Sequence, residues 1–315
     1  PRFFFHGEDG IRDVLVSRGL GDVYKRHHYS EFRCKDTYYY GIIGGFKPFF
    51  VLLQSKDFDF MKNKRPLILI SNDDGYAAKG INSLIEYVRG FGDIIVCAPE
   101  SARSGFSCAF SSELPLRLSL KREEEHLQVW ACNGTPVDCV KIAISQLCDR
   151  LPSIIISGIN HGDNASVNTH YSGTMGVARE GCMKGIPSVA FSLCNYSADA
   201  DFSATKRMIK IITGRVMEDG LPKNVCLNVN FPDCKTFMGT KVCRMCNGIW
   251  ENELVKEHHP RGYDYYWMVG EFRDTEPDAT DTDEWALANG YVAITPTTID
   301  ITDYQAVETI KGWGL

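Results

Sequence analysis

The feature that most constrains this chain is a succession of short, uninterrupted apolar runs that starts at Leu67-Ile68-Leu69-Ile70. Such a run, without alternating polar residues, is typical of a strand buried on both faces of a parallel sheet. Later runs occupy residues 93–98, 153–157 and 188–193, and the helical stretches between the runs occupy residues 80–88, 137–147 and 174–184. This alternation predicts an α/β architecture wound about a largely parallel sheet.

The pattern changes after about residue 235, where aromatic residues and loop-forming residues become frequent. The aromatic residues of this region include Trp250, Tyr263, Tyr265, Tyr266 and Trp267. Short aromatic runs of this kind predict antiparallel strands, and the region closes on a further apolar run at residues 290–296. We interpret residues 235–285 as a small excursion, an oligomerisation arm, appended to the core.

Residues 1–60 show no clear periodicity, and the first methionine of the chain is Met61. We expect these residues to be a non-native extension, with Met61 as the true start. The alternative is a poorly ordered N-terminal arm, because chain termini are often loosely held.

The net charge and the cysteines of the chain indicate which partners and which cellular compartment to expect. The net charge is −6, and basic clusters such as residues 62–65 are short, so duplex nucleic acid is not an expected partner. The cysteines lie scattered in apolar runs, which predicts reduced thiols and a cytoplasmic location. The most apolar stretch, residues 41–53, is short and interrupted, so no membrane helix and no membrane partner are expected.

Small, polar or acidic residues follow each predicted strand. Ligands of an open parallel sheet bind beyond the carboxyl ends of its strands, so these positions are the candidates for function. They are residues 71–75, 103–105, 157–160 and 171–174.

Adjacent carboxylates at Asp73 and Asp74 repel each other and are costly to desolvate, so the pair needs a compensating cation. Together with the hydroxyl of Ser104 and the amide oxygen of Asn160, they form a set of hard oxygen ligands. That set favours one Mg²⁺ or Mn²⁺ ion over zinc and indicates phosphate chemistry. Taken alone, Asp-Asp-Gly is also typical of a solvated turn.

A phosphate cradle is predicted at residues 168–176, where hydroxyl side chains precede a helix. Ser172, Gly173 and Thr174 stand at its start, and the N–H groups of a helix N-terminus attract anions. The alternative is an ordinary helix cap with a glycine turn. His170 lies beside the cradle, and we expect it either to contact substrate or protonate the leaving oxygen, or to play no part.

These motifs together resemble the SurE family of survival-protein nucleotidases, from about Pro66 to the end of the chain. The motifs are Ser71-Asn72-Asp73-Asp74-Gly75, Arg103-Ser104-Gly105, Gly134-Thr135-Pro136-Val137-Asp138-Cys139, Ser157-Gly158-Ile159-Asn160 with Gly162 and Asn164, and Tyr171-Ser172-Gly173-Thr174. Thr282-Asp283 with Ala286, before residues 290–296, resembles the C-terminal signature of the family.

The resemblance implies a Rossmann-like core of three layers and a metal-dependent 5′- and 3′-nucleotidase, a homodimer or homotetramer held by a C-terminal arm. It implies that nucleoside monophosphates are the substrates, besides other phosphomonoesters and short polyphosphate in some members. By position, the metal ligands would be Asp73, Asp74, Ser104 and Asn160, and the phosphate contacts Asn164, Ser172, Gly173 and Thr174. His161 and Asp163 depart from the small or apolar residues usual in that loop, which puts the substrate contacts of the loop in doubt.

Two chemistries remain open for Asp73, which either positions and deprotonates a water or acts as a covalent nucleophile. A nucleotide-binding module without turnover is a further alternative, because fold does not fix function. Neither the G-x-G-x-x-G fingerprint nor the P-loop motif is present in the sequence.

Two other motifs are interpreted as structural. Cys243-Arg244-Met245-Cys246 has the spacing of a zinc or redox site, but no second pair follows at finger-like spacing. His258-His259 is expected in a surface loop.

Overall fold

The computed structural model describes residues 65–314 and, before them, the backbone of five short strands. The chain divides into two compact units, Pro1–Arg65 and Pro66–Leu315. In the first unit, β1 (Arg2–Phe4) pairs with β2 (Val14–Val16), and β3 (Tyr29–Cys34), β4 (Thr37–Ile42) and β5 (Phe50–Gln54) form an antiparallel sheet. Met61 lies outside the described residues, so the expectation for residues 1–60 stays a prediction.

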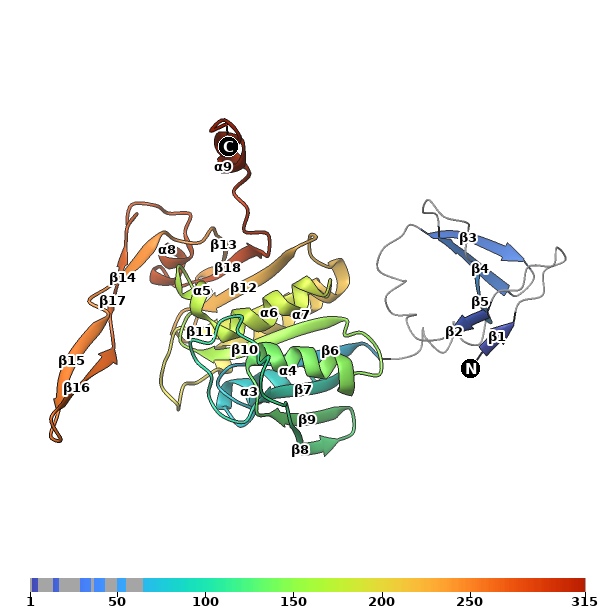
Figure 1. Ribbon diagram of the computed structural model, residues 1–315, viewed down its shortest axis with the longest axis horizontal. Helices are drawn as coiled ribbons and strands as arrows, with labels where there is room; N and C mark the ends of the chain where they lie inside the picture. The colour runs from blue at the N-terminus through green and yellow to red at the C-terminus, as the bar shows by residue number, and fades with distance from the viewer. Residues whose placement is uncertain are drawn as a thin grey trace. The chain divides into compact units, whose positions relative to one another are not determined.

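The second unit is built on a nine-stranded sheet with the order β13-β18-β12-β11-β10-β6-β7-β9-β8 (Figure 1). The strands are β6 (Leu67–Ser71), β7 (Asp93–Pro99), β8 (Leu118–Glu124), β9 (Leu127–Cys132), β10 (Ile154–His161), β11 (Ser188–Leu193), β12 (Val225–Phe231), β13 (Gly239–Val242) and β18 (Tyr291–Thr298). The six strands from β12 to β9 run parallel, while β8 and β18 pair antiparallel with their neighbours β9 and β12. The prediction of a largely parallel α/β sheet is confirmed.

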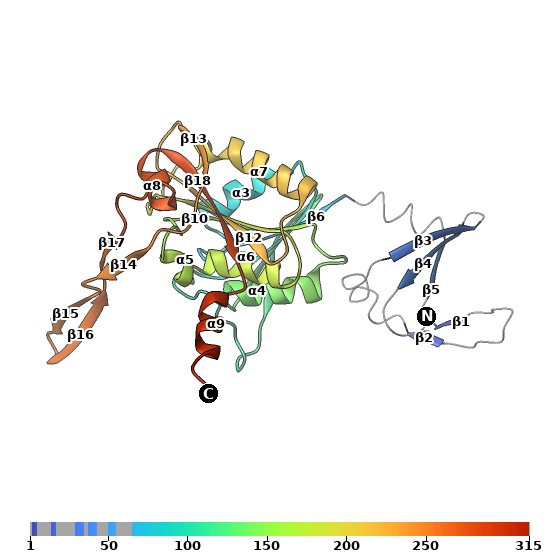
Figure 2. The same cartoon turned by 90° about the horizontal axis from the view of Figure 1, so that it is seen from above.

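Helices cover both faces of this sheet (Figure 2). On one face lie α3 (Lys79–Val88) and α7 (Lys206–Asp219), which follows the short helix η2 (Ser203–Thr205). On the other face lie α4 (Pro136–Ile142), continued by the π-helical turn η1 (Ala143–Leu147), and α6 (Gly173–Met183), which follows the single turn α5 (Asn168–Tyr171). The core therefore has three layers, as a Rossmann-like fold requires.

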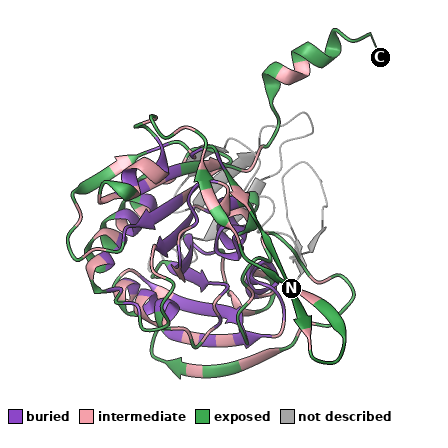
Figure 3. Ribbon diagram, turned by 90° about the vertical axis from the view of Figure 1, so that its left-hand side faces the viewer, coloured by how far each residue is buried: buried purple, intermediate pink, exposed green. Residues whose placement is uncertain are grey.

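The first strand shows why its sequence has no polar alternation. Ile68 and Ile70 pack in the cluster under α3 and α7, while Leu67 and Leu69 pack in the cluster under α4 and α6. All four are at most 2% exposed, so the sheet is buried on both sides (Figure 3). Each such side chain stabilises the fold by about 1.5–3 kcal/mol relative to leaving it exposed.

The order of the strands creates a switch point at the centre of the sheet. From β6 the chain runs through β7 to β9 on one side, and then returns to build β10, β11 and β12 on the other. β6 and β10 pair directly, yet the connections from them leave in opposite directions. Their carboxyl ends therefore frame the crevice in which α/β proteins bind ligands.

The aromatic-rich region forms two antiparallel strand pairs that project from the core (Figures 1 and 2). We call them the arm: β14 (Gly248–Glu251) pairs with β17 (Glu271–Asp274), and β15 (Leu254–His259) pairs with β16 (Tyr263–Met268). Tyr263, Tyr266 and Trp267 are more than half exposed. The antiparallel prediction is confirmed, but His258 and His259 end a strand instead of lying in a loop, because they pair with Asp264 and Tyr263 of β16.

The chain ends after α8 (Asp283–Ala288) and β18 with α9 (Tyr304–Lys311), in which no residue is buried. Among the helices of the described residues, none has the length and apolar character needed to span a membrane.

Candidate functional site

Asp73 follows β6 at the switch point and is 4% exposed. Thr174 donates its hydroxyl to Asp73 Oδ1. Burial raises the pKa of Asp73 to about 6, although the hydroxyl of Thr174 opposes the rise, and the neighbouring charge of Asp74 adds to it. The site therefore contains a carboxyl group that takes up or releases a proton near neutral pH.

The turn that carries Asp73 and Asp74 is braced by its own side chains. Asn72 is fully buried, donates to the carbonyl of Gly75 (3.1 Å) and accepts from its N–H (3.2 Å). Gly75 has φ +101°, a conformation that a residue with a Cβ adopts only with strain. The Asp-Asp-Gly sequence is thus a fixed turn at a strand end instead of a solvated one.

Asp74 contacts the backbone of β10 across the switch point. The N–H of His161 lies 3.4 Å from Asp74 Oδ2, and burial raises the pKa of Asp74 while the charge of His161 lowers it. His161 Nδ1 also lies 2.8 Å from the carbonyl oxygen of Ser197. This unusual histidine therefore connects one acidic residue of the site to the loop after β11.

Asn160 lies within β10, which runs through His161 instead of ending at Ser157 as predicted. The pairing with β11 shifts register between Ser157 and Asn160, so glycine and asparagine continue the strand through an irregularity. The amide oxygen of Asn160 lies 3.4 Å from the hydroxyl of Thr174, the same hydroxyl that contacts Asp73. Asp73 and Asn160, predicted from different strand ends, therefore meet at one threonine.

Ser104 lies in the loop after β7, which reaches the same end of the sheet. The N–H of Arg103 donates to the carbonyl of Asp73 (2.7 Å), and the N–H of Ser107 donates to the carbonyl of Tyr171 (3.1 Å). The loop is thus joined both to the Asp73 turn and to the start of α6. The backbone contact of Arg103 holds the adjacent Ser104 near the site. Ser104 itself is exposed, and its role as a ligand stays a prediction.

The predicted phosphate cradle is the N-terminus of α6. Ser172 is the N-cap and accepts from the N–H of Met175 (3.0 Å). At Gly173 a Cβ would lie 2.8 Å from Asp73 Cβ, closer than side chains pack, so only glycine lets the helix approach the carboxylate this far. The positive end of the helix dipole therefore lies directly beside Asp73.

The residues at this crevice fit a hard divalent cation. The charge of Asp74 acts on Asp73, and the charge of His161 acts on Asp74. Within residues 65–314 no group of three or more His, Cys, Asp or Glu is placed to hold a metal. Two aspartates with hydroxyl and amide oxygens thus suit Mg²⁺ or Mn²⁺ better than zinc.

Comparison with known proteins identifies the family. The family model described as "Survival protein SurE" matches residues 68–252. A 5′-nucleotidase SurE of Phocaeicola vulgatus is 56% identical over 255 residues, 81% of this chain and 99% of that protein; one of Bacteroides thetaiotaomicron is 49% identical over 253 residues, 80% and 98%. The chain belongs to the SurE family. The crystal structure of the SurE protein from Aquifex aeolicus aligns with a TM-score of 0.68 and 33% identity, over 79% of this chain and all of that one.

Asn164, a predicted phosphate contact of the SurE motif, is 4% exposed and held by the core. Its backbone N–H donates to Asn230 Oδ1 (2.7 Å), its carbonyl accepts from Asn228 Nδ2 (2.7 Å), and its side chain donates to Ser192 Oγ (2.6 Å). The segment is therefore anchored through both its backbone and its side chain. Contact between Asn164 and phosphate stays a prediction.

His170, which was predicted beside the cradle, is exposed, and its carbonyl accepts from the hydroxyl of Ser107 (2.6 Å). The backbone of this residue thus helps to hold the loop that carries Ser104. Its imidazole is free to meet a substrate from solvent, and that role stays a prediction.

The cysteines at 243 and 246 are free, buried thiols. Cys243 contacts the carbonyl of Lys241 (3.3 Å), whereas Cys246 contacts Asp274 (3.2 Å). The two thiols therefore have separate partners, in agreement with a structural role.

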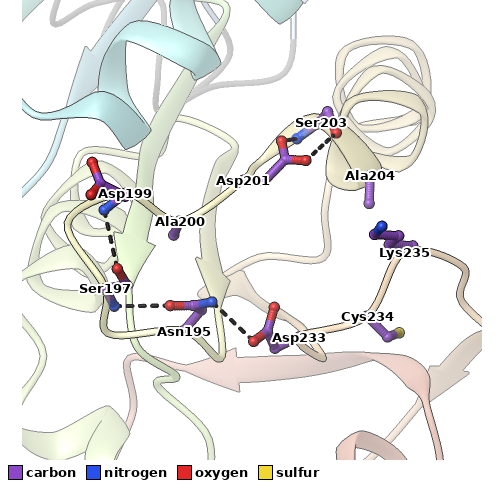
Figure 4. A pocket seen from close by; sticks show the side chains of 10 residues that line it. All are labelled: Asn195, Ser197, Asp199, Ala200, Asp201, Ser203, Ala204, Asp233, Cys234 and Lys235. Carbon is purple, nitrogen blue, oxygen red and sulfur yellow. Dashed lines mark hydrogen bonds between the residues drawn. The ribbon is translucent and has the colours of Figure 1, made fainter.

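A hollow of about 530 Å³ lies between the loops that follow β11 and β12 (Figure 4). Asn195 donates to Asp233 (2.9 Å) at one end of it, and Asp201 accepts from the N–H and the hydroxyl of Ser203 at the other. Ala200 and Phe202 of the same loop pack in the cluster under α3 and α7. The hollow thus lies at the same carboxyl edge of the sheet as the cradle, and Ser197 in its lining contacts His161 of the site.

Sequence reasoning missed the residues that support the site. It gave no role to Arg103, Asn228 or Asn230. The Nε of Arg103 is buried without a hydrogen-bond partner. The one available signal was two asparagines on the same face of a strand, where asparagine is disfavoured unless its side chain has a specific partner.

Proposed function

We propose that this SurE chain is a metal-dependent phosphomonoesterase that hydrolyses nucleoside 5′-monophosphates, and also 3′-monophosphates, to nucleoside and phosphate. The observation that carries the proposal is the buried Asp73 carboxyl group, which lies against the N-terminus of α6 at the switch point. The relatives named 5′-nucleotidase SurE, at 49–56% identity, support the nucleotide substrate.

The proposed cofactor is one Mg²⁺ or Mn²⁺ ion, held by Asp73, Asp74, Ser104 and Asn160. When bound, such an ion supplies charge neutralisation for a phosphoryl group and acidifies a water molecule. The proposal is supported by the hydroxyl of Thr174, which contacts both Asp73 and Asn160. Thr174 helps to fix the orientation of the Asp73 carboxylate, because its hydroxyl holds one of the two oxygens.

Asp73 is the proposed general base, because it is the buried carboxylate that lies against the N-terminus of α6, where the phosphoryl group is proposed to bind. Asp73 Oδ2, the oxygen that Thr174 does not hold, would take the proton from the attacking water. The N–H groups of Ser172 to Thr174, at the positive end of α6, would stabilise charge on the phosphoryl oxygens. His170 would protonate the leaving oxygen of the nucleoside from the solvent side.

The alternative, in which Asp73 attacks phosphorus, releases the nucleoside and forms an acyl phosphate that water then hydrolyses, differs in the number of displacements at phosphorus. The stereochemistry of hydrolysis of a thiophosphate ester made chiral with oxygen isotopes separates the two. A single direct attack by water inverts the configuration at phosphorus. Two successive displacements, by Asp73 and then by water, would retain it and show the covalent route.

We propose further that the chain is a homodimer or homotetramer in the cytoplasm. The exposed aromatic side chains of the arm support an oligomer contact, since large exposed apolar patches mark interaction surfaces. The cysteines of residues 65–314 are free thiols, which agrees with a reducing compartment.

The experiment that tests the function is phosphate release from a panel of nucleoside 5′- and 3′-monophosphates by metal-stripped protein. We expect no release until Mg²⁺ or Mn²⁺ is restored. Asp199→Asn, an aspartate substitution in the hollow of Figure 4, is the matched control and should respond to metal as the wild type does. Metal-dependent binding of nucleotides without release would instead show a binding module, and release without metal would exclude the proposed cofactor.

A further inference from the structure

The segment that leads into the cradle, residues 163–172, is bonded to the base of the arm as well as to the core. Its partner at the base of the arm is Asp283, the first residue of α8, which is fully buried. Asp283 Oδ2 accepts from the N–H of Ser166 (3.0 Å), and Oδ1 accepts from the N–H of Cys246 (2.8 Å). One carboxylate thus joins the segment to the strand that enters the arm.

A second set of contacts runs parallel to this bridge. The hydroxyl of Ser166 donates to the carbonyl of Cys246 (2.9 Å), and the indole N–H of Trp250, in β14, donates to Asn168 Oδ1 (2.9 Å). Asn168 begins α5, and its carbonyl accepts from the N–H of Ser172, the N-cap of α6. Two hydrogen bonds in series, both made by Asn168, therefore connect Trp250 of the arm to Ser172.

The core holds the opposite side of the same segment. Asn228 and Asn230 bind the backbone of Asn164, two residues before Ser166. The segment is thus clamped between two supports, and only one of them belongs to the parallel sheet. An error of about 1 Å in the position of a group that binds substrate can cost on the order of 100-fold in rate.

We propose that Asp283 is a positioning residue for the phosphate-binding segment, and that the base of the arm is thereby part of the support of the active site. Asp283 does not touch the substrate. One of its oxygens holds the backbone of Ser166 and the other holds the backbone of Cys246, and through α5 this bridge fixes Ser172 and the start of α6. The inference rests on the proposed function for its catalytic readout only.

The test uses two variants that break the bridge at different points. Asp283→Asn keeps the shape but leaves a single accepting oxygen, so either Ser166 or Cys246 loses its partner. Trp250→Phe removes the bond to Asn168 and keeps a ring that can pack on Phe272. Their matched controls are Asp264→Asn on the exposed strand β16, and Trp130→Phe on β9, which removes an indole hydrogen bond to Gln128.

We expect Asp283→Asn to lower kcat about tenfold and by the same factor for a nucleoside monophosphate and for 4-nitrophenyl phosphate, because the two share only the phosphate. Trp250→Phe should lower kcat about threefold. Hydrogen exchange of residues 163–172, followed by mass spectrometry, should be faster in both variants, while both controls match the wild type. Light scattering at the assay concentration should give the wild-type assembly for every protein compared.

Wild-type kcat and wild-type exchange in Asp283→Asn would overturn the proposal, as would an equal loss in Asp264→Asn. If Asp283→Asn does not fold, Trp250→Phe decides by the same two readouts. If the wild type hydrolyses no phosphomonoester, the proposed function fails, and the exchange of residues 163–172 still decides whether the base of the arm positions the segment.

Discussion

The crevice at Asp73 and the hollow of Figure 4 both lie at the carboxyl edge of one sheet, and they differ in what surrounds their carboxylates. The hollow is roomy, but Asp199, Asp201 and Asp233 in it are exposed. Asp73, by contrast, is buried against a helix N-terminus. The volume of a hollow alone therefore does not indicate a functional site. A titratable group that is buried away from water is the better indicator.

The same side chain behaves in opposite ways at the two places. Burial raises the pKa of Asp73, whereas the N–H and hydroxyl of Ser203 lower the pKa of Asp201. A buried carboxylate, whose charged form is poorly solvated, binds a cation or a proton readily. A carboxylate whose charge is already stabilised by hydrogen bonds is stabilised little further by either. This difference can be tested by matched substitutions in the two regions.

The largest effect is expected from removing oxygen ligands in the crevice. Asp73→Asn and Asn160→Ala should each lower metal-dependent phosphate release on the order of 100-fold or more, because several kcal/mol of charge stabilisation depend on them. Asp233→Asn in the hollow is the control. Near wild-type turnover in either crevice variant would mean that the cation binds elsewhere.

The pH dependence of stability should separate the two regions next. In metal-free protein, Asp73 has a pKa of about 6 in the fold against 3.8 for an ordinary aspartate, so the folded state binds the proton more tightly than the unfolded chain. Stability from this group is present at low pH and is lost, by about 3 kcal/mol, as the pH rises through 6.

Urea unfolding with a chelator at pH 4 and pH 8 measures this loss. Asp73→Asn should reduce the difference between the two pH values, while Asp201→Asn should not, because the pKa of Asp201 is lowered. An unchanged pH dependence in Asp73→Asn would remove Asp73 as its source.

A smaller effect is expected from the hydroxyl that joins Asp73 to Asn160. Thr174→Val keeps the shape but leaves a buried carboxylate oxygen without its donor, so activity should fall about tenfold. Thr205→Val, which removes a buried hydroxyl near the hollow, is the control. Equal activity of the two variants would show that Thr174 only caps or packs.

His170→Gln should lower turnover about threefold and leave metal affinity unchanged, because the loss of one hydrogen bond from an exposed side chain to the substrate costs about 0.5–1.5 kcal/mol. The affinity is measured by Mn²⁺ titration and the turnover by phosphate release. Kinetics identical to the wild type would remove His170 from the site.

The smallest effect concerns the hollow. Asp199→Asn and Asp233→Asn should change kcat/KM for nucleoside monophosphates less than about twofold, the range of ordinary surface substitutions. A KM that rises for nucleotides but not for 4-nitrophenyl phosphate would break the comparison, because the hollow would then receive the nucleoside.

The sequence was sufficient for the buried elements and for the residues at their ends. The continuous apolar runs located β6, β7 and β11 within one or two residues, because burial on both faces leaves no room for polar residues. The sequence did not show that β10 continues to His161, since glycine and asparagine there resemble a loop. It also did not reveal the hairpin of β8 and β9, whose outer strand is largely exposed and polar.

The residues that support the site could not be predicted from the sequence, for a different reason. Asn228, Asn230 and Asp283 act through partners far along the chain, and a buried polar residue shows its role only when the fold supplies its partner. Local sequence around Ser172 could not distinguish a helix cap from a phosphate cradle, because in the structure the cap itself lies beside Asp73.

The bond between Ser166 and Asp283 also has a consequence for synthesis of the protein. The two residues are 117 positions apart, so translation delivers the phosphate-binding segment long before the carboxylate that holds it. At about 5–20 residues per second, a nascent chain has its parallel strands for some seconds without that support. We therefore expect full hydrolytic activity only when the chain is nearly complete.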